Sequence, residues 1–363
     1  MIDTRVSALE LLNFAEDVFK KVGFSEEEAT LISGNLISAD LRGIDSHGIA
    51  RLSGYLRLIK AGRIKTNAVP FIVHQTPSTA VLDADGGLGL LVATKAMDIA
   101  IEKAKQVGTG WVSVSNSSHF GIAGRHAMQA LPHNMIGIAM TNASALVAPT
   151  FGKQRMLGTN PIAVAIPAGR QPPFVADFAT TTAANGKLEI LQRKGADTPN
   201  GWVLNKEGQE STNANILKEG GVLLPLGSDY EHGSHKGYGL GSIVDIFSAV
   251  FSGANYGPWV PPFPAYIPIP ENPVGKGIGH FFGAMRIDAW QPADVFKARM
   301  DHWIEAFRNT EPINPEQPVL IHGDLERAFE LERTAKGIPI HPNVVADLKK
   351  VAEELGITTG IFS

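Results

Sequence analysis

The pattern of apolar and polar positions changes along the chain and divides it into distinct parts. In residues 1–70 the apolar positions recur at helical spacing. One such stripe comprises Ala29, Ile32, Leu36 and Ala39. The segments Ser7 to Glu10 and Ser25 to Glu28 have the spacing of capping boxes, in which a serine and a glutamate satisfy backbone amides at the start of a helix. We therefore predict a helical segment with little strand at the start of the chain.

Residues 42–51 read Arg-Gly-Ile-Asp-Ser-His-Gly-Ile-Ala-Arg and predict the start of a further helix. Asp45 and Ser46 are good N-cap residues, and a periodic apolar run follows them. On such a helix His47 and Arg51 would share one face, and the helix dipole would favour the neutral imidazole. A neutral histidine beside a cation suits a site that binds an anion and moves a proton. A solvated pair on a surface helix is the alternative.

From residue 68 onward, short apolar runs alternate with amphipathic segments. The predicted strands cover residues 79–83, 110–114, 136–140, 161–166 and 174–176. The predicted helices cover residues 90–107, a segment from about 122, and 183–193. Strands separated by helices are typical of an α/β domain with a partly parallel sheet.

Polar side chains follow three of these strands. His119 follows the second strand and Asp177 follows the fifth. Asn142 and Ser144 follow the third. Open α/β sheets bind ligands beyond the carboxyl ends of their strands, because backbone amides and helix starts point into the crevice there. A single polar residue after a strand usually belongs to a turn, but three such clusters in succession indicate a site.

Two unusual segments lie in the second half of the chain. His235-Lys236-Gly237 precedes an apolar helix predicted over 242–251, and a lysine with glycines there either binds phosphate or allows close packing. Residues 257–273 contain seven prolines. This Pro-rich segment is either a polyproline ligand for a partner domain or an ordered surface excursion or dimer contact. The remaining predictions are an irregular segment at 197–226, a strand at 281–287 and helices at 292–307, 324–336 and 344–355.

Composition narrows the classes of protein. A chain of 363 residues with 44% hydrophobic residues is long enough for two or three domains with buried cores. The net charge of -4 and the lack of a basic run argue against binding to nucleic acid. The absence of cysteine excludes disulfides and thiolate chemistry and suits a reducing compartment. Early charged residues and short apolar runs predict no signal peptide, no membrane span and a cytoplasmic location.

The polar residues leave alternatives to a cofactor-dependent enzyme. The potential zinc or iron ligands are His47, His119, His126 and Asp177. No two of them have the spacing of a local ligand pair, so we predict no metal and keep a metal-dependent lyase or hydrolase as the alternative. A serine hydrolase is disfavoured, because the G-x-S-x-G motif is absent and Ser46 adjoins His47. A third hypothesis is a non-catalytic interaction protein that displays the Pro-rich segment.

The glycine fingerprint of a Rossmann dinucleotide site is also absent. Gly87-Leu-Gly89 is followed by Val92, and Gly237-Tyr-Gly239 by Ser242, where the third glycine should stand. The residues alone therefore indicate an α/β enzyme with a constellation of histidine, arginine and aspartate and a potential phosphate site.

Six motifs occur in order over nearly the whole chain. They are RGIDSHGIAR (42–51), SSHFG (117–121), GTNP (158–161), DFAT (177–180), HKGYGL (235–240) and ERTAKGIP (332–339). Together they resemble the malate/L-lactate dehydrogenase family, which is unrelated to the Rossmann lactate and malate dehydrogenases. That family also includes ureidoglycolate, sulfolactate, diketogulonate and piperideine-carboxylate reductases.

The resemblance implies an oxidoreductase that uses NAD, with NADP as the alternative, to interconvert a 2-oxo acid and a 2-hydroxy acid. It implies His47 or His119 as the acid/base, with His47 placed first as proton donor, and Arg51 as the carboxylate-binding group. The candidate catalytic set is completed by Ser46, Asp177 and Thr159. The implied cofactor-binding residues are Ser144, Asp177, Phe178, Ala179, Lys236 and His119. Neither the individual substrate nor the choice of cofactor follows from the residues.

The resemblance further implies a non-Rossmann nucleotide-binding α/β domain with a mixed sheet over residues 71–284. A helical domain on the substrate side would combine residues 1–70 with 285–363, and a homodimer would place the active site near its interface. The chain departs from the family pattern at Arg125-His126, where aromatics are usual. A cation there would either favour a dianionic substrate or face solvent. Further departures are the segment 321–324, where a Pro-Gly-Glu motif is common, and the length of the Pro-rich segment.

Overall fold

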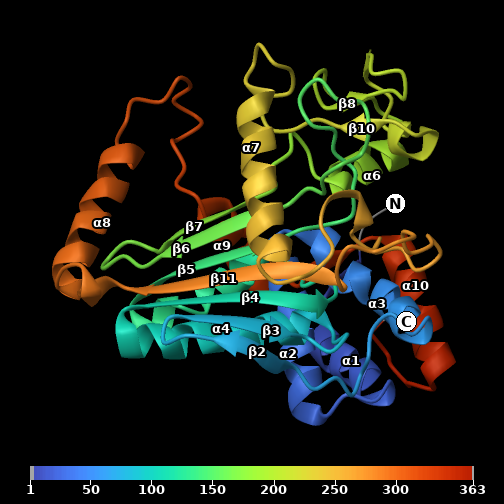
Figure 1. Ribbon diagram of the computed structural model, residues 1–363, viewed down its shortest axis with the longest axis horizontal. Helices are drawn as coiled ribbons and strands as arrows, with labels where there is room; N and C mark the ends of the chain where they lie inside the picture. The colour runs from blue at the N-terminus through green and yellow to red at the C-terminus, as the bar shows by residue number, and fades with distance from the viewer. Residues whose placement is uncertain (1–3, 362–363) are drawn as a thin grey trace.

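The computed structural model describes residues 4–361, and its centre is a seven-stranded sheet with the order β2-β3-β4-β11-β5-β6-β7 (Figure 1). Within this sheet β3 and β4 pair in parallel, and the other neighbours pair antiparallel. The strands are β2 (Phe71–Gln75), β3 (Thr79–Asp83), β4 (Thr109–Ser117), β5 (Met135–Thr141), β6 (Ile162–Ile166), β7 (Phe174–Phe178) and β11 (Ile278–Arg286). The predicted α/β class with a mixed sheet is confirmed, although parallel pairing is confined to one pair.

The strand directions bring the predicted polar clusters to one edge of the sheet. The antiparallel β11 lies between β4 and β5, and the antiparallel β6 lies between β5 and β7. As a result β4, β5 and β7 all run the same way, and the segments that follow them emerge at the same edge. His119, Ser144 and the end of β7 at Phe178 therefore belong to one region, and the partly parallel pairing expected from the sequence is that of β3 with β4.

Helices cover both faces of the sheet (Figure 1). One face is covered by α4 (Gly89–Val107) and α5 (Ala123–Met128), and α7 (Ser234–Asp245) stands on the other, continued by a π-helical turn at Ile246–Val250. Two glycines allow the helices to approach the strands closely. A Cβ on Gly110 would lie 1.9 Å from the Ala100 carbonyl oxygen, and one on Gly137 would lie 1.9 Å from that of Ala127. Glycine at these two positions thus sets the depth at which α4 and α5 pack.

The two ends of the described chain share a core. The first strand, β1 (Thr4–Val6), pairs with β12 (Ile338–Ile340), which agrees with the prediction of a helical segment with little strand. Around this pair lie α1 (Ala8–Lys21), α2 (Glu26–Leu41), α3 (Leu52–Lys60), α9 (Asp324–Lys336) and α10 (Pro342–Leu355). Both predicted capping boxes are confirmed, since Ser7 and Ser25 accept from the amides of Glu10 and Glu28. The division into residues 71–284 and 1–70 with 285–363 stays a prediction.

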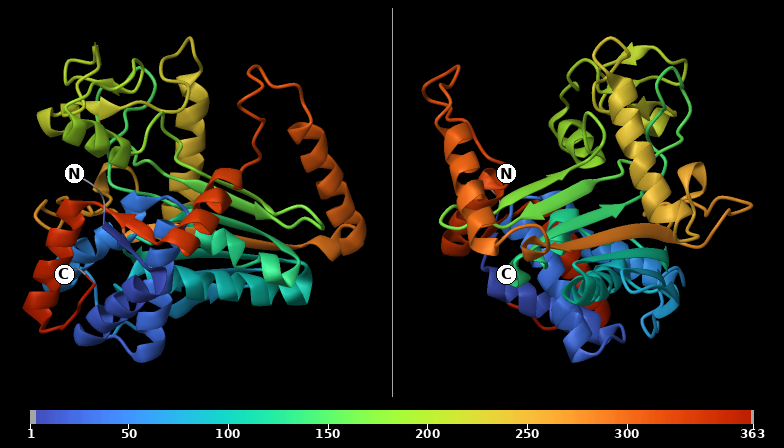
Figure 2. Two further views of the ribbon diagram at one scale, coloured as in Figure 1. Left: turned by 180° about the vertical axis from the view of Figure 1, so that it is seen from behind. Right: turned by 60° about the vertical axis from the view of Figure 1, so that its left-hand side comes forward.

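A small lobe beyond α7 and the long helix α8 complete the fold (Figure 2). The lobe holds α6 (Asn185–Lys194), β8 (Val203–Leu204), β9 (Glu210–Ser211) and β10 (Val222–Leu223), and is otherwise irregular as predicted. The helix α8 (Ala293–Arg308) is attached to the turn between β6 and β7 through Asp301, with further contacts from Glu305 and Arg308. Asp301 on α8 accepts hydrogen bonds from the backbone amides of Gly169, Arg170 and Gln171 at 2.8–3.0 Å. Across residues 4–361 no helix has the length and apolar character needed to cross a membrane.

Candidate active site

The segment around His47 forms two 3-10 turns, Asp45–His47 and Ile49–Arg51, directly before α3. The single capped helix predicted here is therefore wrong, and neither Asp45 nor Ser46 caps it. Gly48 interrupts the turns with an extended backbone, and a Cβ there would lie 1.9 Å from Oδ1 of the buried Asp40. Asp40 itself accepts a hydrogen bond from the Ile49 amide at 2.7 Å, so the carboxylate that holds this segment comes from α2.

The side chains predicted as caps serve other contacts. The Asp45 carboxylate forms an ion pair with Arg333 of α9, which also donates to the Asp40 carbonyl. The Ser46 hydroxyl lies 2.8 Å from Nδ1 of His47. Ser46 thus orients the imidazole, while Arg333 ties the segment to the C-terminal part of the chain.

His47 and His119 meet face to face. Their ring centroids are 5.4 Å apart and the ring planes differ by 25°. The Tyr55 hydroxyl lies 2.6 Å from Nδ1 of His119, and the Gly121 amide donates to the same nitrogen at 3.4 Å. Because an amide can only donate, Nδ1 of His119 is the acceptor, the Tyr55 hydroxyl donates to it, and the ring proton resides on Nε2.

The environment keeps both imidazoles neutral near pH 7. Burial, followed by the charge of Arg51, lowers the pKa of His47 to about 4. Burial and then the neighbouring His47 and Arg51 hold the pKa of His119 well below its ordinary value. The neutral state predicted from a helix dipole is thus favoured for a different reason. Since each ring disfavours charge on the other, the pair accommodates one proton far more readily than two.

Arg51 lies between this pair and an open cavity. Its Nε donates to the Ser46 carbonyl, which leaves the two terminal nitrogens as donors for a ligand. A cavity of about 770 Å³ is lined by Ser46 and Arg51 on one side and by α6 and α10 on others. Arg333 and Lys350 also border it, as do Asp40, Asp45, Glu189 and Asp347, so both signs of charge line the cavity.

Asp177 is held at the start of α5. Its carboxylate accepts a hydrogen bond from the Gly124 amide at 2.7 Å, and a Cβ on Gly124 would lie 2.8 Å from Oδ2. Burial raises the pKa of Asp177 to about 6, against the lowering effects of that amide and of Arg42. The side chain therefore anchors the helix that follows the His119 loop and carries a proton more readily than an ordinary aspartate.

The segments predicted to bind the cofactor converge around Asn160, a residue that the sequence analysis did not single out. Asn160 is fully buried, accepts from the Ala143 amide at 3.1 Å and donates to the Gly241 carbonyl at 3.0 Å. The neighbouring Thr159 carbonyl accepts from the Thr180 amide at 2.9 Å. The side chain of Asn160 thus joins α7 to the loop after β5, which carries Ser144. The backbone of Thr159 binds the segment that follows Phe178 and Ala179. The position of Asn160 in the GTNP motif was the available signal.

Asn142 lies outside the predicted site. Its side-chain amide donates to Oδ1 of Asp245 at 2.8 Å and to the Asn255 carbonyl at 2.8 Å, in the buried layer beneath α7. Of the polar pair after β5, Ser144 is the residue that reaches the edge of the sheet. Its hydroxyl accepts from the Phe263 amide at 3.3 Å.

The start of α7 fits a dinucleotide phosphate. The helix begins at Ser234 rather than near Ser242, and no side chain caps its first amides. Lys236 lies exposed in the first turn, and Phe178 is 39% exposed at the end of β7. Gly237 serves the close packing that was the alternative, since a Cβ there would lie 2.2 Å from the Leu226 carbonyl oxygen. The amides of Ser234 and Lys236 donate to backbone carbonyls, and a helix start without a side-chain cap next to a lysine suits a phosphate of a dinucleotide.

The metal-dependent alternative gains no support from the geometry. Across the described range 4–361, no group of three or more histidine or acidic side chains converges as metal ligands would. His126 lies in the core, with Nε2 2.8 Å from the Phe120 carbonyl oxygen, and the adjoining Arg125 is exposed. Of the two residues that depart from the family pattern, His126 is therefore a core residue and Arg125 a surface residue.

Two aromatic residues complete the site and were missed. Tyr55 lies one helical turn after Arg51, a spacing that offered a signal. Phe263 comes from the Pro-rich segment, and its ring centroid lies 5.0 Å from that of His119 and 5.3 Å from that of Tyr55. The Pro-rich segment was predicted as a ligand or a surface excursion, and nothing in its composition indicated which aromatic turns inward.

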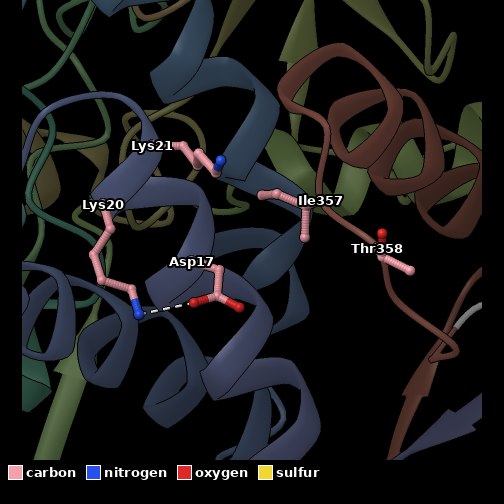
Figure 3. A pocket seen from close by; sticks show the side chains of 5 residues that line it. All are labelled: Asp17, Lys20, Lys21, Ile357 and Thr358. Carbon is pink, nitrogen blue, oxygen red and sulfur yellow. Dashed lines mark ion pairs between the residues drawn. The ribbon is translucent and has the colours of Figure 1, made fainter.

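A second hollow, of about 460 Å³, lies between α1 and the segment after α10 (Figure 3). Asp17, Lys20, Lys21, Ile357 and Thr358 line it. Lys20 is paired with Asp17 at 2.8 Å. This hollow contains none of the predicted site residues, and the ion pair between Lys20 and Asp17 is of the kind found on an ordinary surface helix.

Comparison with known proteins agrees with the motifs over the whole chain. The family model described as malate/L-lactate dehydrogenase matches residues 6–349. A malate dehydrogenase of Pyrococcus abyssi is 41% identical over 354 residues, covering 97% of this chain and 95% of that protein. An L-sulfolactate dehydrogenase of Methanocaldococcus jannaschii is 37% identical over 341 residues, 94% of each. The crystal structure of a malate dehydrogenase from Entamoeba histolytica superposes with a TM-score of 0.92 at 34% identity, covering 99% of both chains. The chain therefore belongs to the malate/L-lactate dehydrogenase family.

Proposed function

We propose that this protein is an NAD(P)-dependent oxidoreductase that interconverts a small 2-oxo acid and the corresponding 2-hydroxy acid. The observation that carries the proposal is the neutral pair His47 and His119 stacked beside the available terminal nitrogens of Arg51. A guanidinium binds a carboxylate through two parallel hydrogen bonds, and an adjacent imidazole can then move a proton to or from the 2-oxygen. The names of the relatives, malate and sulfolactate dehydrogenase, support the same class of substrate.

His47 is the proposed proton donor, with His119 as the alternative. Burial and then the cation of Arg51 lower the pKa of His47, and a substrate carboxylate that neutralises this cation would remove the second of these two effects. Ser46 holds the ring through Nδ1 and leaves Nε2 to face the substrate. In the opposite direction the same nitrogen of His47 would accept the proton, and His119, fixed by Tyr55, would support this ring. Thr159 and Asp177 would line the substrate side.

The proposed cofactor is NAD, with NADP as the alternative. When bound, the nicotinamide supplies or accepts the hydride. The chain would hold it with the uncapped start of α7 and Lys236 at the phosphates, and with Ser144, Phe178 and Ala179 at the edge of the sheet. Asp177 and His119 would border the nicotinamide end.

A homodimer, the division into two domains and a cytoplasmic location belong to the same proposal. The exposed side of α8 carries Val295, Trp303 and Phe307, which are 40–48% exposed, and α9 carries the exposed Leu325 and Phe329. Apolar side chains of this size on two helices support burial against a second copy. The shared core of residues before 70 and after 337, which Leu88, Leu90 and Leu91 join from the other domain, supports the helical domain, and the absence of cysteine suits the cytoplasm.

Oxidation of NADH and NADPH with a panel of 2-oxo acids tests this function. The panel contains pyruvate, oxaloacetate, sulfopyruvate, diketogulonate and a cyclic imine carboxylate, and absorbance of the reduced nicotinamide is the readout. We expect turnover with at least one 2-oxo acid and one cofactor. No turnover with any acid, together with no change in NADH fluorescence on mixing, would overturn the proposal.

A further inference from the structure

The Pro-rich segment, residues 257–273, contributes one side chain to the active site. The Phe263 ring lies 5.0 Å from the His119 ring and 5.3 Å from the Tyr55 ring, both edge to face. The central carbon of the Arg51 guanidinium lies over the same ring, 5.5 Å from its centroid. Phe263 therefore touches the proposed carboxylate-binding group and one of the two proposed proton-transfer groups.

The backbone around Phe263 is restrained on both sides. Prolines stand at 261, 262 and 264, which limits the conformations open to the peptide. The Ser144 hydroxyl accepts from the Phe263 amide at 3.3 Å and donates to the Pro261 carbonyl at 3.4 Å. The Arg63 guanidinium donates to the Pro262 carbonyl at 3.3 Å. The loop is thus tied to the end of β5 and to the segment after α3.

The ring itself is seated on a glycine. A Cβ on Gly54 would lie 2.7 Å from Cε1 of Phe263, so any larger residue in this turn of α3 would displace the ring. The site therefore combines a restrained loop with a seat that accepts the ring only because Gly54 lacks a side chain. Such an arrangement is a fixed wall rather than a mobile side chain.

A bound 2-oxo acid would have to pass close to this wall. With its carboxylate on Arg51 and its 2-oxygen at the histidines, the carbon chain spans the space between groups that Phe263 contacts. The group attached to C3 would then meet the phenyl ring. This step rests on the proposed function, because it uses Arg51 and the histidines as the anchors.

We propose that Phe263 is the specificity-determining residue that limits the substrate to compact 2-oxo acids. Removing the ring opens the volume of a phenyl group beside C3, so bulky 2-oxo acids gain room that compact ones do not use. In an apolar pocket a difference of even one methylene changes kcat/KM by about tenfold or more, and a phenyl group is considerably larger.

The test compares kcat/KM of wild type and Phe263→Ala for oxaloacetate and pyruvate against phenylpyruvate and 4-methyl-2-oxopentanoate. We expect the ratio of bulky to compact substrates to rise by about tenfold or more in Phe263→Ala. Tyr266→Ala is the matched control, because Tyr266 lies in the same segment and is 85% exposed. Its ratio should stay at the wild-type value.

Two results separate the inference from the proposed function. A wild type that turns over 2-oxo acids, with a ratio in Phe263→Ala equal to that of the control, would overturn the inference alone. A wild type without turnover would overturn the proposed function and the inference with it. If Phe263→Ala does not fold, Phe263→Leu and Gly54→Ala decide. Phe263→Leu should raise the ratio of bulky to compact substrates by a smaller factor. Gly54→Ala should push the ring into the pocket and lower this ratio. Unchanged ratios in both variants would overturn the inference.

Discussion

The buried His126 predicts a specific loss of stability in acid. Its side chain is 0% exposed, and burial lowers its pKa to about 4 from an ordinary value near 6.5. The folded protein therefore binds this proton less readily than the unfolded chain does. Because the folded pKa of His126 lies below the unfolded one, its contribution to the free energy of unfolding is complete above the unfolded pKa. That contribution is lost as the pH falls from about 6.5 toward 4.

The shift sets the magnitude of the effect. A pKa lowered from 6.5 to about 4 corresponds to about 3 kcal/mol once the pH is below both values. At about pH 5 the unfolded histidine is largely protonated and the folded one is not, which gives a loss of about 2 kcal/mol relative to neutral pH. Other groups titrate in the same interval, including Asp177, whose raised pKa acts in the opposite direction.

A substitution at His126 separates its contribution from theirs. His126→Gln cannot titrate, and its side-chain amide can still donate to the Phe120 carbonyl that Nε2 of His126 now contacts at 2.8 Å. Urea unfolding of both proteins from neutral pH to about pH 5 should show the wild type losing about 2 kcal/mol more than the variant. Parallel curves with a constant offset would refute the reasoning, because they would mean that His126 is protonated as easily in the folded as in the unfolded state.

Three further predictions concern the site and the attachment of α8. His47→Ala and His119→Ala should each lower kcat by about 10²–10⁴-fold in assays of NADH oxidation. Near wild-type turnover in both would show the proton-transfer assignment to be wrong. Arg51→Lys should raise KM for the 2-oxo acid by about tenfold or more, because a point charge replaces a two-pronged donor, and an unchanged KM would remove its proposed role. Asp301→Ala should lower the free energy of unfolding by about 2–3 kcal/mol, since three backbone amides lose their acceptor. Arg299→Ala, at an exposed position of the same helix, is its control, and an equal loss in both variants would contradict this account.

Local signals in the sequence predicted the helices well. The serine and glutamate of both capping boxes bind as expected, and the helix predicted over 324–336 matches α9 in both bounds. These elements depend on residues within one helical turn of each other, so the chain itself contains the information. The edge strand β2 was missed because all five of its residues are exposed and show no alternation.

The sequence predicted the candidate site residues but not the residues that hold them in place. His47, Arg51 and His119 meet as the motifs implied, yet Asp40 on α2 and Arg333 on α9 hold the segment that carries the first two. Phe263 reaches the rings from more than 140 residues away along the chain from His119. Contacts of this kind depend on how distant elements pack, and no spacing within the sequence encodes them.

The common direction of β4, β5 and β7 has a practical consequence for spectroscopy. The turn between β6 and β7 lies at the opposite edge of the sheet from the proposed site, and the Arg170 side chain there is 82% exposed. Asp301 binds the Arg170 backbone amide, so this bond survives a change of side chain that removes the exposed ion pairs of Arg170 with Asp301 and Glu305. Because the chain has no cysteine of its own, Arg170→Cys would create a single attachment point for a fluorophore. Such a label would report the docking of α8 while leaving the histidine pair untouched.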